Sequence, residues 1–156
     1  CHVFREAIRN AAIGAGVQVA NGGTYLCIEG PQFSTRAESN LYRQWGADII
    51  GMTAMPEARL AREAELCYAT LAMVTDFDVW HESEGHVTVE LVTANLHKNA
   101  DVARRLVRAI AAAGLPERSC SCQSALENAI VTPPEHIPAE TRQRLSLIVD
   151  RYLPPA

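Results

Sequence analysis

Two carboxylates, Asp76 and Asp78, stand two positions apart directly after the longest apolar run of the sequence. If that run is a buried strand, both side chains share a partly desolvated neighbourhood at its end. Burial and mutual repulsion each raise the pKa of a carboxyl group, so one of the two could keep its proton near neutral pH. Such a group can serve as a general acid. Two aspartates that only cap the following turn would have the same spacing.

A second candidate for chemistry is Thr53, which follows Gly51 and Met52 after another short apolar segment. Small neighbours leave room for backbone amides to approach an anion, and Pro56 is typical of the first turn of a helix. Because helix N-termini attract anions, Thr53 is a candidate phosphate ligand. The alternatives are a threonine that only caps the helix and methionines, Met52 and Met55, that only fill the core.

Phe33 follows a Gly-Pro-Gln sequence at the expected apex of a loop. An aromatic ring there could stack on a flat heterocycle, although a core phenylalanine under a loop fits the spacing equally well. The five histidines, at positions 2, 81, 86, 97 and 136, have no metal-ligand spacing. We expect them to be solvated or locally hydrogen-bonded.

Alternating strands and helices are predicted around these residues. Strands are expected at 17–20, 24–28, 47–50 and 68–74, and helices at 3–15, at 36–45 with Ser34 or Thr35 as N-cap, at 56–66, at 87–113 with a possible break near Asn99, and at 138–153. This order is typical of an α/β sheet with crossover helices, where ligands gather beyond the carboxyl ends of strands. Thr53 and the aspartate pair both lie at such ends.

Composition and charge exclude several classes of protein. At 156 residues and 17.0 kDa, the chain has the length of one domain. A net charge of −4 and a pI near 5.7 leave no basic stripe for nucleic acid. No apolar run approaches the roughly 18 residues that span a bilayer, and the first residues lack a signal-peptide pattern. We therefore expect a cytoplasmic protein that binds neither nucleic acid nor membrane.

The five cysteines include only one closely spaced pair, Cys120 and Cys122. Cys1, Cys27 and Cys67 stand alone, which favours reduced, buried thiols. The pair lacks the second pair of ligands that a zinc site requires, so no metal is expected. A strained local disulfide or two free thiols fit the spacing better.

Three motifs, taken in order, carry a family resemblance: EGPQFSTRAE at 29–38, GMTAMPEA at 51–58 and TDFD at 75–78. The stretch from Gly22 to about Asn99 closely resembles the trimeric purine nucleoside phosphorylase family, and within it the 5′-methylthioadenosine phosphorylases. Several motifs in order are more specific than any single one. The sequence CSCQSALENAIVTPPE, from Cys120, resembles the Cys-X-Cys extension of microbial members.

The resemblance implies an α/β fold with a three-layer mixed sheet and flanking helices, of which this chain would form only the C-terminal part. Family members carry a glycine-containing phosphate loop, an Arg-His phosphate pair and a Thr-Ala segment in an N-terminal half. We expect residues 1–119 to be the C-terminal half of that domain and residues 120–156 to be a Cys-X-Cys tail with a terminal helix in the same domain. The N-terminal half would be a partner, and the assembly a homotrimer or hexamer.

The resemblance also assigns a nucleoside pocket. Phe33 would lie at the purine and ribose face, while Ile50 and Met52 would line the nucleoside, with Met52 touching the ribose. Val89 and Val92 would line an apolar pocket for a 5′-methylthio group. In the family a neighbouring subunit completes this last pocket.

By the same resemblance, Thr53 would hold phosphate, Asp76 would protonate or hydrogen-bond purine N7, and Asp78 would accept a hydrogen bond from the exocyclic 6-amino group. Phosphorolysis builds negative charge on the departing purine, so a neutral acid at N7 is most useful in the transition state. Relatives that prefer 6-oxopurines have Asn where Asp76 stands. TDFD therefore favours 6-aminopurines.

The expected function is phosphorolysis of 5′-methylthioadenosine to adenine and 5-methylthioribose 1-phosphate, a pentosyltransferase reaction of purine and methionine salvage. Inorganic phosphate would be a co-substrate, and no organic cofactor or metal is expected. One alternative is a purine nucleoside phosphorylase that acts on adenosine or inosine. The other is an inactive subunit-like module that only supports assembly.

Overall fold

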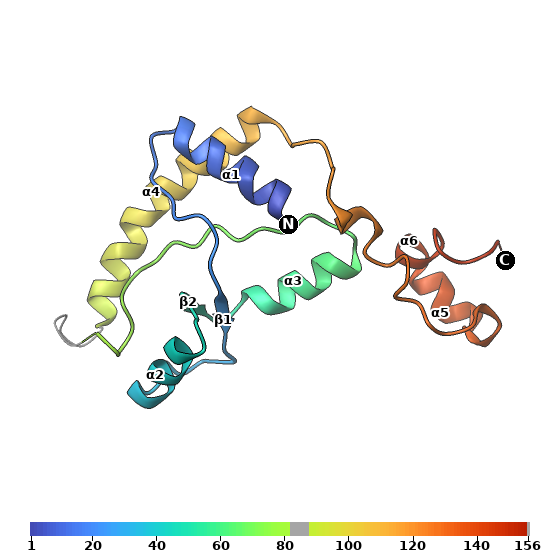
Figure 1. The fold of residues 1–156 in the computed structure, drawn as a ribbon, viewed down its shortest axis with the longest axis horizontal. Coiled ribbons are helices and arrows are strands. Elements are labelled where there is room, and N and C mark those ends of the chain that lie inside the picture. The colour runs from blue at the N-terminus through green and yellow to red at the C-terminus, as the bar shows by residue number, and fades with distance from the viewer. Residues whose placement is uncertain (82–87, 156) are drawn as a thin grey trace.

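The computed structural model describes residues 1–81 and 88–155. In chain order the elements are α1 (His2–Gly14), β1 (Tyr25–Cys27), α2 (Arg36–Gln44), β2 (Ile49–Gly51), α3 (Ala54–Glu63), α4 (Val89–Ala113), the 3-10 helices η1 (Ser121–Ser124) and η2 (Pro134–His136), α5 (Ala139–Arg144) and α6 (Ser146–Val149). Figure 1 shows α1 crossing α4, the two strands between α2 and α3, and the α5–α6 tail at the opposite end of the molecule.

The main helix contact joins α1 to α4. Ile8 and Ala12 lie one turn apart on α1, so they face the same side, and both are buried together with Leu106 of α4. Thr88 caps α4 by accepting a hydrogen bond from the Leu91 N–H at 3.2 Å. The break predicted near Asn99 is wrong, because α4 continues through that residue. Residue 87, where this helix was predicted to begin, and His86 lie outside the described residues.

The sheet has two strands among the described residues. β1 and β2 pair in parallel, with Tyr25 opposite Ile49 and Cys27 opposite Gly51, and α2 is the crossover helix between them. The strands predicted at 24–28 and 47–50 are therefore confirmed in position. The α/β class follows from this crossover.

Two other predicted strands, 17–20 and 68–74, are absent from the described structure. A strand needs a neighbouring ladder, whereas the carbonyl groups at the ends of the second segment bond to other donors. The Asn99 side chain donates to the Val74 carbonyl at 2.9 Å, and the amino group of Cys1 donates to the Tyr68 carbonyl at 2.6 Å. One contact with α4 and one with the start of the chain hold the apolar run, which has no strand pairing in the described part of the chain.

α2 begins as predicted, and of the two candidate N-cap residues, Ser34 and Thr35, the structure has Thr35 in that position. The Glu38 N–H donates to the Thr35 hydroxyl at 3.3 Å, and the Thr35 N–H donates to the Glu38 carboxylate at 2.7 Å, which completes a capping box. α3 spans Ala54–Glu63, so the predicted span of 56–66 is displaced toward the C-terminus. The helix ends early because Glu65 adopts a φ of 54°, outside the helical region.

The C-terminal tail contains two short helices where one helix at 138–153 is predicted. Leu145, with φ −101° and ψ 8°, separates α5 from α6. Glu65 ties this tail to the loop after α3. Its carboxylate accepts hydrogen bonds from the Leu126 N–H at 3.1 Å and the Tyr152 hydroxyl, and it pairs with Arg151 at 3.3 Å.

Replacing Glu65 with glutamine is expected to loosen the tail. The hydrogen bond from the Tyr152 hydroxyl holds the pKa of Glu65 below its usual value of 4.5. The stability from the carboxylate is therefore present above pH 4.5 and lost as the pH falls through the lowered folded pKa.

Limited proteolysis should cut the tail several-fold faster in Glu65→Gln at neutral pH, and the tail of the unchanged protein should loosen only in acid. Glu63→Gln, at an exposed position, is the control. Equal cleavage of all three proteins would contradict this role.

A large part of the chain's surface lacks a partner. The accessible area is 11490 Å², whereas a folded monomer of this mass exposes about 7,700 Å². Apolar side chains contribute to the excess, with Leu115 83% exposed and Leu147 fully exposed. The chain thus buries less of itself than an independent domain of its size. Among the described residues, no helix has both the length and the apolar character to cross a bilayer.

Candidate active site

A cavity of about 730 Å³ opens beside the strand pair. The loop at 28–34, one face of α2, the end of β2 and the segment 70–80 form its walls. It brings together these predicted site residues: Phe33, Ile50, Met52, Thr53, Asp76 and Asp78. Residues from three separate motifs therefore share one cavity at the carboxyl end of β2, where α/β folds place their ligands.

The two aspartates are linked to each other through the backbone. Asp76 Oδ1 accepts a hydrogen bond from the Asp78 N–H at 2.9 Å, and its Oδ2 accepts one from the Thr75 hydroxyl at 2.7 Å. Asp78 adopts a φ of 61°, which turns the chain sharply after Phe77. The Asp76 carboxylate thus stabilises the turn that positions Asp78, in addition to lining the cavity.

Asp78 is also held from the other side of the cavity. The hydroxyl of Ser39 donates to Asp78 Oδ2 at 2.6 Å, and Ser39 is only 2% exposed. A buried hydroxyl that donates to a carboxylate is a strong, charge-assisted contact. It fixes the orientation of the Asp78 carboxyl group and joins α2 to the TDFD motif.

Two glycines give the site its close packing. Gly30 has a φ of 68°, and a Cβ there would lie 2.5 Å from the Met52 sulfur. A Cβ on Gly51 would lie 1.9 Å from the Tyr25 hydroxyl oxygen. Any larger residue would displace Met52 or Tyr25, both of which line the cavity. Both glycines therefore allow this close packing, and Gly30 also allows the left-handed backbone conformation at its position.

Thr53 occupies the position before α3, with φ −124° and ψ −25°. In the described part of the chain its side chain makes no capping hydrogen bond. Its hydroxyl is exposed at the cavity, beside the first N–H groups of a ten-residue helix. A hydroxyl and a helix N-terminus together can hold an anion.

Comparison with known proteins places the chain in a family. The model of the Phosphorylase superfamily matches residues 1–112. The chain belongs to this superfamily. It is 53% identical to the S-methyl-5′-thioadenosine phosphorylase of Koribacter versatilis over 97% of the chain and 52% of the relative. The corresponding enzyme of Gloeobacter violaceus is also 53% identical, over 97% of the chain and 51% of the relative.

Solved structures agree with the family. A methylthioadenosine phosphorylase from an Antarctic soil metagenomic library has a TM-score of 0.81 at 48% identity, covering 92% of this chain and 52% of that one. The Schistosoma mansoni methylthioadenosine phosphorylase in complex with adenine has a TM-score of 0.71 at 33% identity, covering 80% and 50%. The chain thus has a nucleoside phosphorylase-like α/β fold and spans about half the length of the relatives it matches.

Two predicted site residues, Val89 and Val92, are not among the described residues that line the cavity. Val89 and Val92 lie in the first turn of α4, and Val89 is 74% exposed. One turn later, the Asn95 side chain donates to the Thr75 carbonyl at 2.5 Å, which ties α4 to the TDFD motif. The start of α4 is therefore tied to the site, while a contribution of the two valines to a 5′-methylthio pocket stays a prediction.

Phe33 is 69% exposed at the cavity, so the alternative of a core phenylalanine does not hold. Beside it, the Ser34 hydroxyl is buried and has no hydrogen-bond partner among the described residues. A buried hydroxyl without a partner is unfavourable unless a ligand or water completes it. From the sequence Ser34 is only a candidate helix cap, and the structure adds it to the residues that a bound ligand could contact.

Ser39 is the other residue that sequence reasoning missed. Ser39, Tyr42 and Arg43 of α2 follow an i, i+3, i+4 spacing, and all three line the cavity. That spacing is the signal in the sequence that could have identified this face. Arg43 also lies over the ring of Trp80 at 3.6 Å, which closes the outer wall.

Proposed function

We propose that the protein to which this chain contributes its site is an S-methyl-5′-thioadenosine phosphorylase. It would convert 5′-methylthioadenosine and phosphate to adenine and 5-methylthioribose 1-phosphate. The observation that carries the proposal is the meeting of Asp76 and Asp78 with Thr53 in one cavity. The close relatives of this name support it.

The purine would lie with its N7 and 6-amino edge toward the aspartates. Ser39 holds Asp78 Oδ2, so Oδ1 would accept the hydrogen bond from the 6-amino group. A 6-oxopurine offers an acceptor at the same place and would be repelled by the carboxylate. Asp78 would thus select the base by the direction of one hydrogen bond.

Asp76 would give its proton to N7 as the glycosidic bond breaks. Its Oδ1 accepts a hydrogen bond from the Asp78 N–H, so the proton would be on Oδ2 and face N7, while the Thr75 hydroxyl can still donate to a remaining lone pair of Oδ2. The neutral acid would then be stabilised by the same partner as the carboxylate. Protonation at N7 neutralises the charge that develops on the departing adenine, so it assists mainly in the transition state.

Phosphate would bind at Thr53 and would need further ligands from outside this chain. One hydroxyl and a helix N-terminus hold a dianion weakly compared with an arginine fork or a phosphate loop. We infer that a second half, equivalent to the remaining length of the relatives, supplies these phosphate ligands. The same half would complete a three-layer mixed sheet. Residues 1–119 and 120–156 would belong to one domain. The excess apolar surface supports such a partner and a homotrimeric or hexameric assembly. The site needs no organic cofactor or metal for catalysis, and the enzyme would act in the cytoplasm.

Product analysis tests the proposed function. The protein containing this chain is incubated with 5′-methylthioadenosine, adenosine or inosine, with and without phosphate, and the released base and sugar phosphate are quantified. We expect phosphate-dependent release of adenine, fastest from 5′-methylthioadenosine. Faster release of hypoxanthine from inosine would support a broad purine nucleoside phosphorylase instead. No turnover of any substrate by the assembled protein would support the assembly module.

Replacing Thr53 with alanine is expected to weaken phosphate binding selectively. One hydrogen bond to a charged group contributes about 1.5–3 kcal/mol, so the KM for phosphate should rise about 10-fold to 100-fold. The KM for the nucleoside should change much less. Thr53→Ser keeps the hydroxyl and is the matched control. Equal increases in both KM values in the alanine variant would indicate a folding defect and contradict a phosphate ligand.

A further inference from the structure

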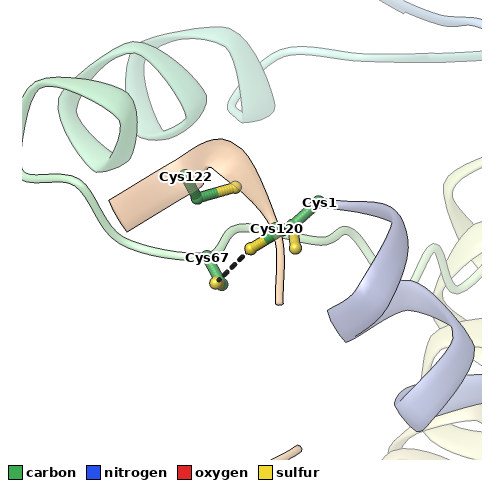
Figure 2. Close-up of side chains that lie close together, drawn as sticks. All are labelled: Cys1, Cys67, Cys120 and Cys122. Carbon is green, nitrogen blue, oxygen red and sulfur yellow. Dashed lines mark hydrogen bonds between the residues drawn. The ribbon is translucent and has the colours of Figure 1, made fainter. Parts of the chain in front are cut away.

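Four cysteine side chains from three separate parts of the chain meet at one point (Figure 2). Cys1 precedes α1, Cys67 lies in the segment after α3, and Cys120 and Cys122 lie at the start of η1. Their Sγ atoms all lie within 4.8 Å of one another, and the Cys67 and Cys120 sulfurs are 3.5 Å apart. All four are free thiols.

The fold supplies what the sequence spacing lacks. From sequence, no metal is expected because Cys120 and Cys122 have no second pair of ligands nearby. Cys1 and Cys67 provide that pair in three dimensions, although they stand far from each other and from the tail in the chain. The expectation of a protein without a metal site is therefore revised for this cluster, which is separate from the catalytic cavity.

The dimensions of the cluster match one tetrahedral metal ion. Zinc binds thiolate sulfur at about 2.3 Å, which places the four sulfurs of a tetrahedron about 3.8 Å apart. The Cys67 and Cys120 sulfurs are 3.5 Å apart and no pair is more than 4.8 Å apart, so only small side-chain movements are needed to close the site. Cys120 is 6% exposed and the other three are half-buried, so the cluster is largely shielded from solvent. We propose that Cys1, Cys67, Cys120 and Cys122 bind one structural Zn²⁺ ion.

Four thiol ligands define the kind of metal and its role. Soft thiolates in a tetrahedral arrangement favour Zn²⁺ over the hard cations Mg²⁺ and Ca²⁺. Binding releases the thiol protons to solvent and leaves a complex of net charge −2, with no change of oxidation state. Four protein ligands leave no open coordination position, so this ion would not activate water or substrate.

The ion would join three segments that already meet through polar contacts, namely the Cys1 amino group on the Tyr68 carbonyl and the Glu65 carboxylate on the tail. α1, the loop after α3 and the C-terminal tail diverge from this point in Figure 1. Because an unfolded chain does not hold the ligands together, the free energy of metal binding contributes to folding. The ion would therefore fix the tail, and with it the Glu65 contacts, to the body of the phosphorylase.

Metal analysis of the protein containing this chain tests the proposal. After purification under reducing conditions and dialysis against added Zn²⁺, we expect one zinc per chain by elemental analysis. Replacement by Co²⁺ should give the absorption bands of tetrahedral cobalt bound to thiolate. Cys67→Ser and Cys122→Ser should each lower the bound metal severalfold and remove the thiolate bands. Cys27→Ser, in β1 and outside the cluster, should leave both unchanged.

Two results would overturn the proposal. One is reduced, folded protein that binds less than a stoichiometric amount of Zn²⁺ and shows no cobalt-thiolate bands. The other is a thiol count, made after denaturation without reductant, that shows disulfides among these cysteines in protein purified without added oxidant. If the serine variants do not fold, the cobalt spectrum of the unchanged protein decides whether the cysteine cluster binds metal. Removal of zinc by a chelator should also lower Tm, which a bystander ion would not do.

Discussion

Turnover of 5′-methylthioadenosine should fall by about 10²-fold to 10⁴-fold when Asp76 is replaced by asparagine, because an amide cannot transfer a proton to N7. The amide of asparagine can still donate a hydrogen bond to N7, so the fold-loss in adenine affinity should be smaller than the fold-loss in kcat. The relative activity on 6-oxopurine nucleosides should rise, because 6-aminopurine turnover loses the proton transfer while the asparagine amide can still donate a hydrogen bond to N7 of a 6-oxopurine. Steady-state kinetics with adenosine and inosine, each measured with saturating phosphate, give the comparison.

Asp78→Asn is the matched control for this prediction. It also removes one carboxylate of the pair, and the Ser39 hydroxyl can still donate to its amide oxygen. This variant should mainly change base preference, while Asp76→Asn should mainly change the chemical step. A 7-deazapurine nucleoside, which has no N7 acceptor, should bind equally well to the unchanged protein and to Asp76→Asn. Unchanged kinetics of Asp76→Asn with both substrate classes would show that Asp76 only stabilises the turn.

The second large effect concerns the chain by itself. Residues Cys1–Ala156 expressed alone should show no phosphorolysis above background, because Thr53 is the only phosphate ligand that we assign in the described residues. Arginine forks and successive backbone amides provide most of the stabilisation at phosphate sites, so their loss is expected to be multiplicative. Adding a segment equivalent to the N-terminal half of the relatives should restore activity.

The same experiment has a structural readout. The isolated chain should bind an apolar-surface dye strongly, and the dye signal should fall when the second segment is added, because exposed residues such as Leu115 become covered. Phosphate-dependent cleavage of 5′-methylthioadenosine by the isolated chain would contradict this account. It would require a second set of phosphate ligands within the chain.

The local parts of the fold could be predicted because they depend on neighbouring residues. Thr35 and Glu38 form their capping box within one turn, so the start of α2 follows from the sequence alone. The positions of β1 and β2 follow from short apolar segments beside glycines. The cavity at the end of β2 follows from the same rule that places ligands at strand ends.

The parts that could not be predicted depend on distant contacts. The run at 68–74 has the apolar content of a strand, but the donors that meet it, Asn99 and the Cys1 amino group, come from other parts of the chain. The role of Ser39 depends on its hydrogen bond to Asp78, which lies 39 residues further along the chain and has no signal in the local sequence. The cysteine cluster requires three segments to converge, and no spacing in the sequence shows that convergence.

A crystal structure of the complete protein with adenine and phosphate tests the central claim most directly. The account predicts adenine in the 730 Å³ cavity, with N7 within hydrogen-bond distance of Asp76 and the 6-amino group at Asp78. Phosphate should contact the Thr53 hydroxyl. Adenine bound elsewhere, or bound with its N7 and 6-amino edge away from the two aspartates, would contradict it.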